Sequence, residues 1–201
     1  MPDVRTVVIR AFRDRAFVVR AYVGLGANLG DPESTLAAAL AALDVAPGLR
    51  IHTVSPLYAT RPVGPPGQPE YRNAVAAVDV RASGSPQEAA VGFLRTLKAL
   101  ERTFGRKPRR RWGPREIDLD LLIFGRHALT TSRPPLTVPH PLAKERLFVL
   151  APLRDLVPRL RPPGWHETVE SAYRRQLSLE GQDAVRVVGA WDAATGRWRV
   201  S

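Results

Sequence analysis

The alternation of apolar and polar residues predicts four strands in the first two thirds of the chain. Residues 17–26 (FVVRAYVGLG) are rich in β-branched and aromatic residues and end at glycines, which is typical of a buried strand that meets a loop. Residues 49–60 and 71–80 have the same character, and the proline- and glycine-rich stretch between them excludes regular structure. Residues 116–124 (EIDLDLLIF) predict the fourth strand.

Two further segments have helical spacing and clear ends. Asp31 suits an N-cap, the proline after it suits the first turn, and leucines then recur at helical spacing until the Pro-Gly pair at 47–48. The second helix is expected to begin at a capping box formed by Ser85 and Glu88, and its apolar stripe ends at Gly105. Both segments therefore predict helices that pack one face on a sheet.

The resulting order is β-α-β-β-α-β, which predicts an α+β fold with a ferredoxin-like antiparallel sheet sandwiched by helices. Beyond the fourth strand, residues 140–156 predict a turn and a helix, and residues 185–200 predict a terminal hairpin. We expect a basic N-terminal extension at 1–20 and a main domain at 21–160. Residues 161–201 would then be a C-terminal helix and hairpin appended to that domain.

The composition fits one globular domain. The chain has 201 residues and 44% hydrophobic content, enough for a single core. No segment reaches the roughly 18 uninterrupted apolar residues of a membrane span, and the arginine-rich N-terminus lacks an apolar signal core. The absence of cysteine excludes disulfides, a thiolate nucleophile and cysteine-ligated zinc or iron–sulfur sites. We therefore expect a cytoplasmic protein that binds no membrane.

Positive charge is concentrated directly before the fourth strand. The formal net charge is +11, and an excess of this size attracts phosphates, nucleic acid or anionic surfaces. Residues 101–116 contain seven lysines and arginines against two glutamates. This stretch alone holds nearly half of the net charge, so an anionic ligand is expected beside it.

Asp118 and Asp120 lie two positions apart in the fourth predicted strand, so their side chains share one face of it. At an effective dielectric constant near 20, two carboxylates about 6 to 7 Å apart repel by about 2.5 kcal/mol, which calls for a cation. Leu119, Leu121 and Ile123 are expected on the opposite face, in the core. The pair is thus expected to face a cleft.

Paired carboxylates beside arginines suit magnesium bound with a nucleotide. Magnesium takes one or two carboxylates together with substrate phosphates and waters. Arginines would neutralise the charge that moves during phosphoryl transfer. The chain contains no G-x-x-x-x-G-K-[ST] segment, and GLGANLG at 24–30 misses the G-x-G-x-x-G pattern by one position. A P-loop is therefore excluded, and GLGANLG is a weak signal for dinucleotide binding.

Four motifs together resemble the 6-hydroxymethyl-7,8-dihydropterin pyrophosphokinase family. They are YVGLGANLGD, SPLYATRPVGPPGQPEYRNAV, RWGPREIDLDLLIFG and LTVPHPLAKERLFVLAPL, in this order. The resemblance runs from about Ala21 to Leu160 and implies a ferredoxin-like α+β fold. It also implies transfer of pyrophosphate from ATP to the hydroxymethyl group of the pterin, giving AMP and the pterin diphosphate, a step of tetrahydrofolate biosynthesis.

The resemblance implies a role for each matching residue. Asp118 and Asp120 would hold two Mg²⁺ ions that straddle the triphosphate of ATP. The mobile loop would supply Arg106, Trp112 and Arg115, the nucleotide side Glu101, His140 and Arg146, and the pterin pocket Thr60, Val63, Tyr71, Asn73 and Phe148. We expect two aromatic rings to sandwich the pterin while the Asn73 amide reads its edge. No residue stands out as a general base.

Two alternatives remain open at this point. Basic ferredoxin-like modules also bind RNA through exposed strand aromatics, and a basic interaction module without catalytic function would explain the charge. An RNA-binding sheet should be aromatic and basic, whereas this strand presents Asp118 and Asp120 and the chain has no RNP-like segment. We therefore expect a monomeric enzyme that binds ATP and a pterin and no nucleic acid.

Overall fold

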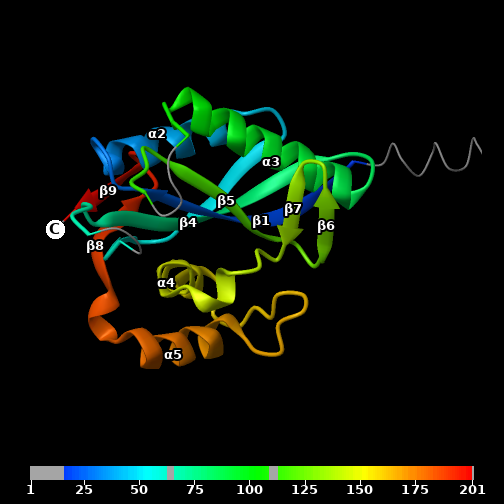
Figure 1. Ribbon diagram of the computed structural model, residues 1–201. Helices are drawn as coiled ribbons and strands as arrows, with labels where there is room; N and C mark the ends of the chain where they lie inside the picture. Colours follow the sequence, from blue (N-terminus) through cyan, green and yellow to red (C-terminus); the bar gives the residue numbers. More distant parts are fainter. Residues whose placement is uncertain (1–15, 63–65, 109–112, 201) are drawn as a thin grey trace, which may run out of the picture.

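The computed structural model describes residues 16–62, 66–108 and 113–200 (Figure 1). Its centre is a seven-stranded sheet in the order β5-β1-β4-β3-β8-β9, with β2 also paired to β4. The strands are β1 (Phe17–Ala27), β2 (Leu49–Val54), β3 (Leu57–Thr60), β4 (Tyr71–Ala82), β5 (Asp118–Phe124), β8 (Val185–Asp192) and β9 (Arg197–Val200). All described pairings in it are antiparallel, and the first five strands have the predicted ferredoxin-like order.

The segment at 49–60, predicted as one strand, is two strands that lie end to end along β4. Ser55 and Pro56 separate them, because proline has no N–H to continue the ladder. The Ser55 hydroxyl instead accepts a hydrogen bond from Val75 N at 3.0 Å, and Ser55 N donates to Val75 O at 2.9 Å. The break therefore leaves the backbone of β4 satisfied.

The two predicted helices are α2 (Pro32–Asp44) and α3 (Pro86–Thr103), which cover one face of the sheet (Figure 1). Their predicted starts are confirmed. Asp31 accepts a hydrogen bond from Ser34 N, and Ser85 and Glu88 form the reciprocal capping box. The core between these helices and the sheet contains the odd-numbered residues of β1 and the even-numbered residues of β4 from Ala74 to Val80.

The opposite face of the sheet is covered by α4 (Leu147–Leu156), with α5 (Val169–Glu180) packed against α4 (Figure 1). Tyr22, Val75 and Leu122 from the sheet form a second core cluster with α4. Short 3₁₀ turns precede α4 and follow α5, namely η1 (Ala143–Glu145) and η2 (Gln182–Ala184). In the three described ranges, no helix has both the length and the apolarity of a membrane span.

One side chain of β5 lies on the opposite face of the sheet from the one expected. Leu119 and Leu121 lie in the α2/α3 core as predicted, but Ile123 lies in the α4 cluster. A register shift between β1 and β5 at Tyr22 explains the difference, because a bulge reverses the alternation beyond it. The bulge follows Asp118 and Asp120, so these two keep their common face.

Two hairpins extend the fold. The hairpin of β6 (Leu129–Ser132) and β7 (Pro135–Val138) lies beside β5 and was not predicted. The terminal hairpin of β8 and β9 was predicted, and it joins the large sheet through β3. Trp198 anchors it, since its indole N–H donates to Ser55 O at 3.0 Å and its ring meets Trp191 edge to face.

Candidate active site

The site is built on neighbouring positions of three adjacent strands. In the β1 register, Gly26 lies opposite Asp118 in β5 and opposite Asn73 in β4, while Gly24 lies opposite Asp120. Glycine has no side chain, so the surface of the sheet has a depression at each glycine. The two glycines thus open a floor between the aspartates and Asn73, which are separated by about 10 Å, two strand spacings.

A cavity of about 330 Å³ lies over this floor. It collects side chains from β1, β3, β4, β5 and α4 and from the loops before β5 and α4. Ten of the predicted site residues line it: Thr60, Tyr71, Asn73, Arg106, Arg115, Asp118, Asp120, His140, Arg146 and Phe148. Residues from almost ninety positions of sequence are therefore brought to one hollow.

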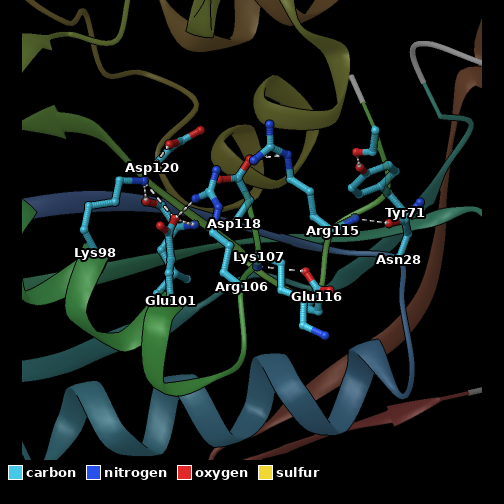
Figure 2. A network of polar contacts seen from close by, with 12 residues as sticks. Asn28, Tyr71, Lys98, Glu101, Arg106, Lys107, Arg115, Glu116, Asp118 and Asp120 are labelled. Carbon is cyan, nitrogen blue, oxygen red and sulfur yellow. Dashed lines mark hydrogen bonds and ion pairs between the residues drawn. The ribbon is translucent and has the colours of Figure 1, made fainter. Parts of the chain in front are cut away.

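Asp118 is met by two arginines of the basic segment (Figure 2). Arg106 Nη1 lies 2.7 Å from Asp118 Oδ1, and Arg115 Nε lies 3.5 Å from Asp118 Oδ2. Arg106 also pairs with Glu101 at the end of α3. Arg106 and Arg115, which were expected to bind phosphate, thus pair with Asp118, which was expected to bind metal.

Glu101 is buried and does not line the cavity. Its Oε1 accepts hydrogen bonds from Leu119 N at 2.8 Å and from Lys98 Nζ at 2.8 Å. The same ammonium donates to Leu119 O at 2.8 Å and to Asp120 Oδ1 at 3.4 Å. Figure 2 shows Lys98 and Glu101 reaching from one helix toward the aspartate strand.

The ion-pair network around the aspartates carries balanced charge. Its members are the three carboxylates Glu101, Asp118 and Asp120 and the three cations Lys98, Arg106 and Arg115. Burial and the neighbouring Asp120 raise the pKa of Asp118, and the two arginines limit that rise. A raised aspartate pKa beside a second carboxylate in a cavity is typical of a functional site.

The opposite end of the cavity is less charged. The Asn73 amide donates from Nδ2 to the Thr60 hydroxyl at 2.7 Å, which fixes the orientation of the amide. Tyr71 donates its hydroxyl to Gly113 O at 3.0 Å, and burial raises its pKa. Phe148 projects from the first turn of α4 beneath the Arg146 guanidinium, 5.6 Å from the ring centre. Two rings and one oriented amide therefore share this end.

His140 presents a neutral imidazole to the cavity. Its burial lowers the pKa, and its Nδ1 accepts a hydrogen bond from Leu142 N at 3.3 Å. With Nδ1 as the acceptor, the proton of the neutral ring lies on Nε2. The backbone of His140 donates to Leu122 O at 2.7 Å, which ties this loop to β5.

Asn28 joins the two loops that flank the cavity. Its backbone N donates to Arg115 O at 3.0 Å, and its Oδ1 accepts from Arg115 N at 2.7 Å. Its Nδ2 donates to Pro69 O at 3.1 Å. This buried side chain links the end of the proline-rich segment to the segment that carries Arg115 (Figure 2).

The other three predicted site residues are Val63, Trp112 and Glu101. Val63 and Trp112 lie outside the described residues. Glu101 reaches the site through Arg106 and the Leu119 backbone rather than by lining the cavity. Its assignment to the nucleotide side stays a prediction.

Sequence reasoning missed Lys98, Asn28 and the two glycines at 24 and 26. Lys98 sits in the polar part of an amphipathic helix, where nothing distinguishes it from a solvated lysine. The glycines did carry a signal, because glycine at alternate strand positions marks one face without side chains. The GLGANLG segment was weighed only as a phosphate-binding pattern, not as a strand with a bare face.

The donor set fits a magnesium ion that arrives with a polyphosphate. Asp118 and Asp120 offer hard carboxylate oxygens on one side of β5, beside open space. Among the described residues, no group of three or more His, Cys, Asp or Glu side chains could hold a metal. Further ligands must therefore come from phosphate oxygens and water, as magnesium prefers.

Comparisons with known proteins identify a family for this chain. The family described as 7,8-dihydro-6-hydroxymethylpterin-pyrophosphokinase matches residues 22–158. The chain is 45% identical over 150 residues to the Pseudomonas aeruginosa 2-amino-4-hydroxy-6-hydroxymethyldihydropteridine pyrophosphokinase, covering 74% of this chain and 88% of that protein. A Synechocystis protein of the same name is 41% identical over 149 residues, with 74% and 72% covered.

A solved structure has the same fold. The crystal structure of a Plasmodium falciparum HPPK-DHPS variant superposes with a TM-score of 0.68 at 13% identity. It covers 94% of this chain and 52% of that chain, so this chain spans about half of that protein. The RNA-binding alternative finds no support, and the sheet face on which bases would stack is covered here by α4.

Proposed function

Because the chain belongs to the 7,8-dihydro-6-hydroxymethylpterin-pyrophosphokinase family, we propose that it transfers pyrophosphate from ATP to 6-hydroxymethyl-7,8-dihydropterin. The products are AMP and the pterin diphosphate, in a step of tetrahydrofolate biosynthesis. One observation carries the proposal best. A single cavity is lined by a carboxylate pair with arginines and by an oriented amide with two aromatic residues, which suits a polyphosphate and a flat heterocycle.

The pterin side positions the acceptor. Thr60 holds the Asn73 amide, so that its Oδ1 and remaining N–H face the donors and acceptors of a pterin edge. Tyr71 and Phe148 supply the ring faces between which the heterocycle stacks. An oriented, stacked pterin presents its hydroxymethyl group toward the aspartates, and such alignment accounts for a large share of the rate of bimolecular transfer.

The nucleotide side supplies cations and donors. Arg106 and Arg115 exchange Asp118 for phosphate oxygens, which accept their N–H groups in a forked geometry. His140 donates from Nε2, and Arg146 adds a further charge from the loop before α4. These donors stabilise the negative charge that moves between the attacking and leaving oxygens.

Asp118 and Asp120 would hold two Mg²⁺ ions. Such ions would supply Lewis-acid polarisation of the phosphate oxygens when bound. Two magnesium ions and ATP carry no net charge together, and the three carboxylates and three cations around the aspartates are also balanced. Arg61 and Arg146 add positive charge on the cavity wall, which favours an anionic ligand.

The bond changes define the reaction. The hydroxymethyl oxygen forms a bond to the β-phosphorus of ATP as the bond from that phosphorus to the α,β-bridging oxygen breaks, and AMP leaves. The hydroxyl proton goes to solvent, and we assign no general base. Trp112 and Val63 keep the lid and pterin-pocket roles that the resemblance implies. The monomeric state and the cytoplasmic location are likewise predictions.

The decisive experiment is an assay of AMP formation with ATP, Mg²⁺ and 6-hydroxymethyl-7,8-dihydropterin. AMP should appear only when the pterin is present, and chelation of Mg²⁺ should stop it. Asp118→Asn and Asp120→Asn should each lower kcat/KM by about a hundredfold or more, because each removes a ligand charge at the reacting phosphates.

Asp79→Asn is the matched control, since Asp79 lies in β4 and pairs with Arg20 away from the cavity. It removes the same charge and should keep the parent rate. Circular dichroism should show that all three variants are folded. Pterin-independent AMP formation, or near-parent rates in both aspartate variants of the site, would refute the proposal.

A further inference from the structure

The peptide unit of Leu119 lies between the two aspartates in sequence and is hydrogen-bonded to side chains of α3. β5 ends the large sheet, with β1 as its only strand neighbour in the sheet order of the described residues. Leu119 N donates to Glu101 Oε1, and Leu119 O accepts from Lys98 Nζ, both at 2.8 Å. Two side chains one helical turn apart thus satisfy both backbone groups that a further strand would otherwise pair.

The ammonium of Lys98 has no unused donor in this arrangement. It has three N–H groups and three acceptors, namely Glu101 Oε1, Leu119 O and Asp120 Oδ1. The acceptors come from two elements, α3 and β5. A compact ammonium suits three such partners, whereas the planar fork of arginine does not.

The position of Asp120 depends on the same contacts. Glu101 is buried, so it needs cations beside it, and Lys98 and Arg106 are the two that it pairs with among the described residues. Because Lys98 also contacts Asp120, one group sets the strand backbone and the carboxylate together. Partners behind a metal ligand commonly fix its orientation in this way.

We propose that Lys98 is a positioning residue for the metal-binding carboxylates. With Glu101 it holds the Leu119 peptide from the open edge of β5, and it aligns Asp120 before the metal–nucleotide complex arrives. The proposal rests on the function proposed above. It assigns Lys98 a role toward the protein's own strand rather than toward a ligand, since Lys98 does not line the cavity.

The test measures metal binding apart from catalysis. Mn²⁺ binding is followed by electron paramagnetic resonance in the presence of a non-cleavable α,β-methylene analogue of ATP. Lys98→Met should raise the Kd for Mn²⁺ about tenfold or more, as loss of a ligand-orienting partner does elsewhere. In the AMP assay, the Mg²⁺ concentration for half-maximal rate should rise equally, and the KM for the pterin should stay at the parent value.

Arg95→Met is the matched control. Arg95 is exposed on the same helix, and removing it lowers the net charge by the same amount. It should bind Mn²⁺ as the parent does. Lys98→Arg keeps the charge but not the three-way geometry, so it should remain weaker than the parent. If Lys98→Met does not fold, the Kd of Lys98→Arg for Mn²⁺ tests the proposal in its place.

The outcomes separate the two proposals. A parent protein that neither binds the Mn²⁺–analogue complex nor forms AMP would refute the proposed function. A parent that does both, with Lys98→Met equal to it, would refute only the positioning role. Tighter Mn²⁺ binding in Lys98→Met would show that the lysine merely repels the metal, and full recovery in Lys98→Arg would show that charge alone suffices. Either result overturns the inference.

Discussion

At the scale of single residues, the side chains of the site are held by partners remote in sequence. The Asn73 amide is oriented by Thr60, and the Tyr71 hydroxyl is bound to Gly113 O. The floor between Asn73 and the aspartates is open because Gly26 has no side chain. A Cβ at Gly26 would lie 3.0 Å from Asn73 Oδ1 and would push the amide out of place. Orientation is therefore set before any ligand binds.

Thr60→Val tests this orientation. The variant keeps the shape of the side chain but removes the acceptor for Asn73 Nδ2, so the amide loses its fixed direction. The loss of one buried hydrogen bond should raise the KM for the pterin about tenfold, with the KM for ATP unchanged. Steady-state kinetics with each substrate varied in turn measure both values.

Thr60→Ser keeps the hydroxyl and is the control. It should restore most of the pterin affinity. Equal losses in the valine and serine variants would mean that packing at Thr60 matters and the hydrogen bond does not.

At the scale of elements, the strands supply the floor of the cavity, and the loops supply its arginines and His140. Arg115 lies on the segment that enters β5, and Pro69 ends the proline-rich segment that enters β4. Asn28, directly after β1, bonds to both. One residue thus couples the segment beside the pterin to the segment beside the nucleotide.

Asn28→Ala should uncouple these two segments. It removes two side-chain hydrogen bonds and leaves the Arg115 amide without its acceptor, which should destabilise the fold by about 2 kcal/mol. Hydrogen–deuterium exchange should quicken in residues 113–117 and 66–70 and stay unchanged in β2, which is remote from Asn28. Uniform quickening across the sheet would indicate global loosening and contradict the coupling.

The order of elements could be predicted from the sequence because each signal is local. Alternation, capping residues and glycine stops reside within a few positions, and they identified both helices and the first and fourth strands. The break at Ser55 was missed although Pro56 is a local signal for it, because a proline inside a strand pattern was overlooked. The facing of Ile123 was wrong for a non-local reason, since the bulge belongs to the pairing with β1.

The same limit applies to the site. Asp118 and Asp120 could be found because their spacing and the arginines near them lie in one short segment. Lys98 could not be found, because its partners Leu119 and Asp120 are about twenty residues away and only the docking of α3 on β5 brings them together. Val63 and Trp112 rest on the family resemblance alone.

At the scale of the whole molecule, ion pairs across the sheet make stability depend on pH. Arg20 in β1 donates to both carboxylate oxygens of Asp79 in β4, at 2.6 and 3.1 Å. The hydrogen bonds from Arg20 lower the pKa of Asp79. A carboxylate whose pKa is lower in the folded state stabilises the fold at pH values above its unfolded-state pKa, about 3.9. This stabilisation is lost as the pH falls through the folded-state pKa.

Asp79→Asn should therefore lower the free energy of unfolding by less than about 1 kcal/mol at pH 7, because the ion pair is partly exposed. At pH values below both the folded-state and the unfolded-state pKa of Asp79, the variant should be as stable as the parent. Urea unfolding of the parent and the variant between pH 7 and pH 3 measures the difference. Arg20→Gln should make the free energy of unfolding less dependent on pH over the same range. A difference that grows toward low pH would have the wrong sign and contradict the linkage.

The docking of β8 onto β3 has a consequence for biosynthesis. All four residues of β3 are buried, and this strand carries Thr60 at its end. A ribosome makes β3 well before β8, so the nascent chain carries this strand with one edge unpaired until residues 185–189 have also been made. An unpaired edge can pair with other chains, so the wall that holds Thr60 is a site of aggregation during synthesis until β8 covers it.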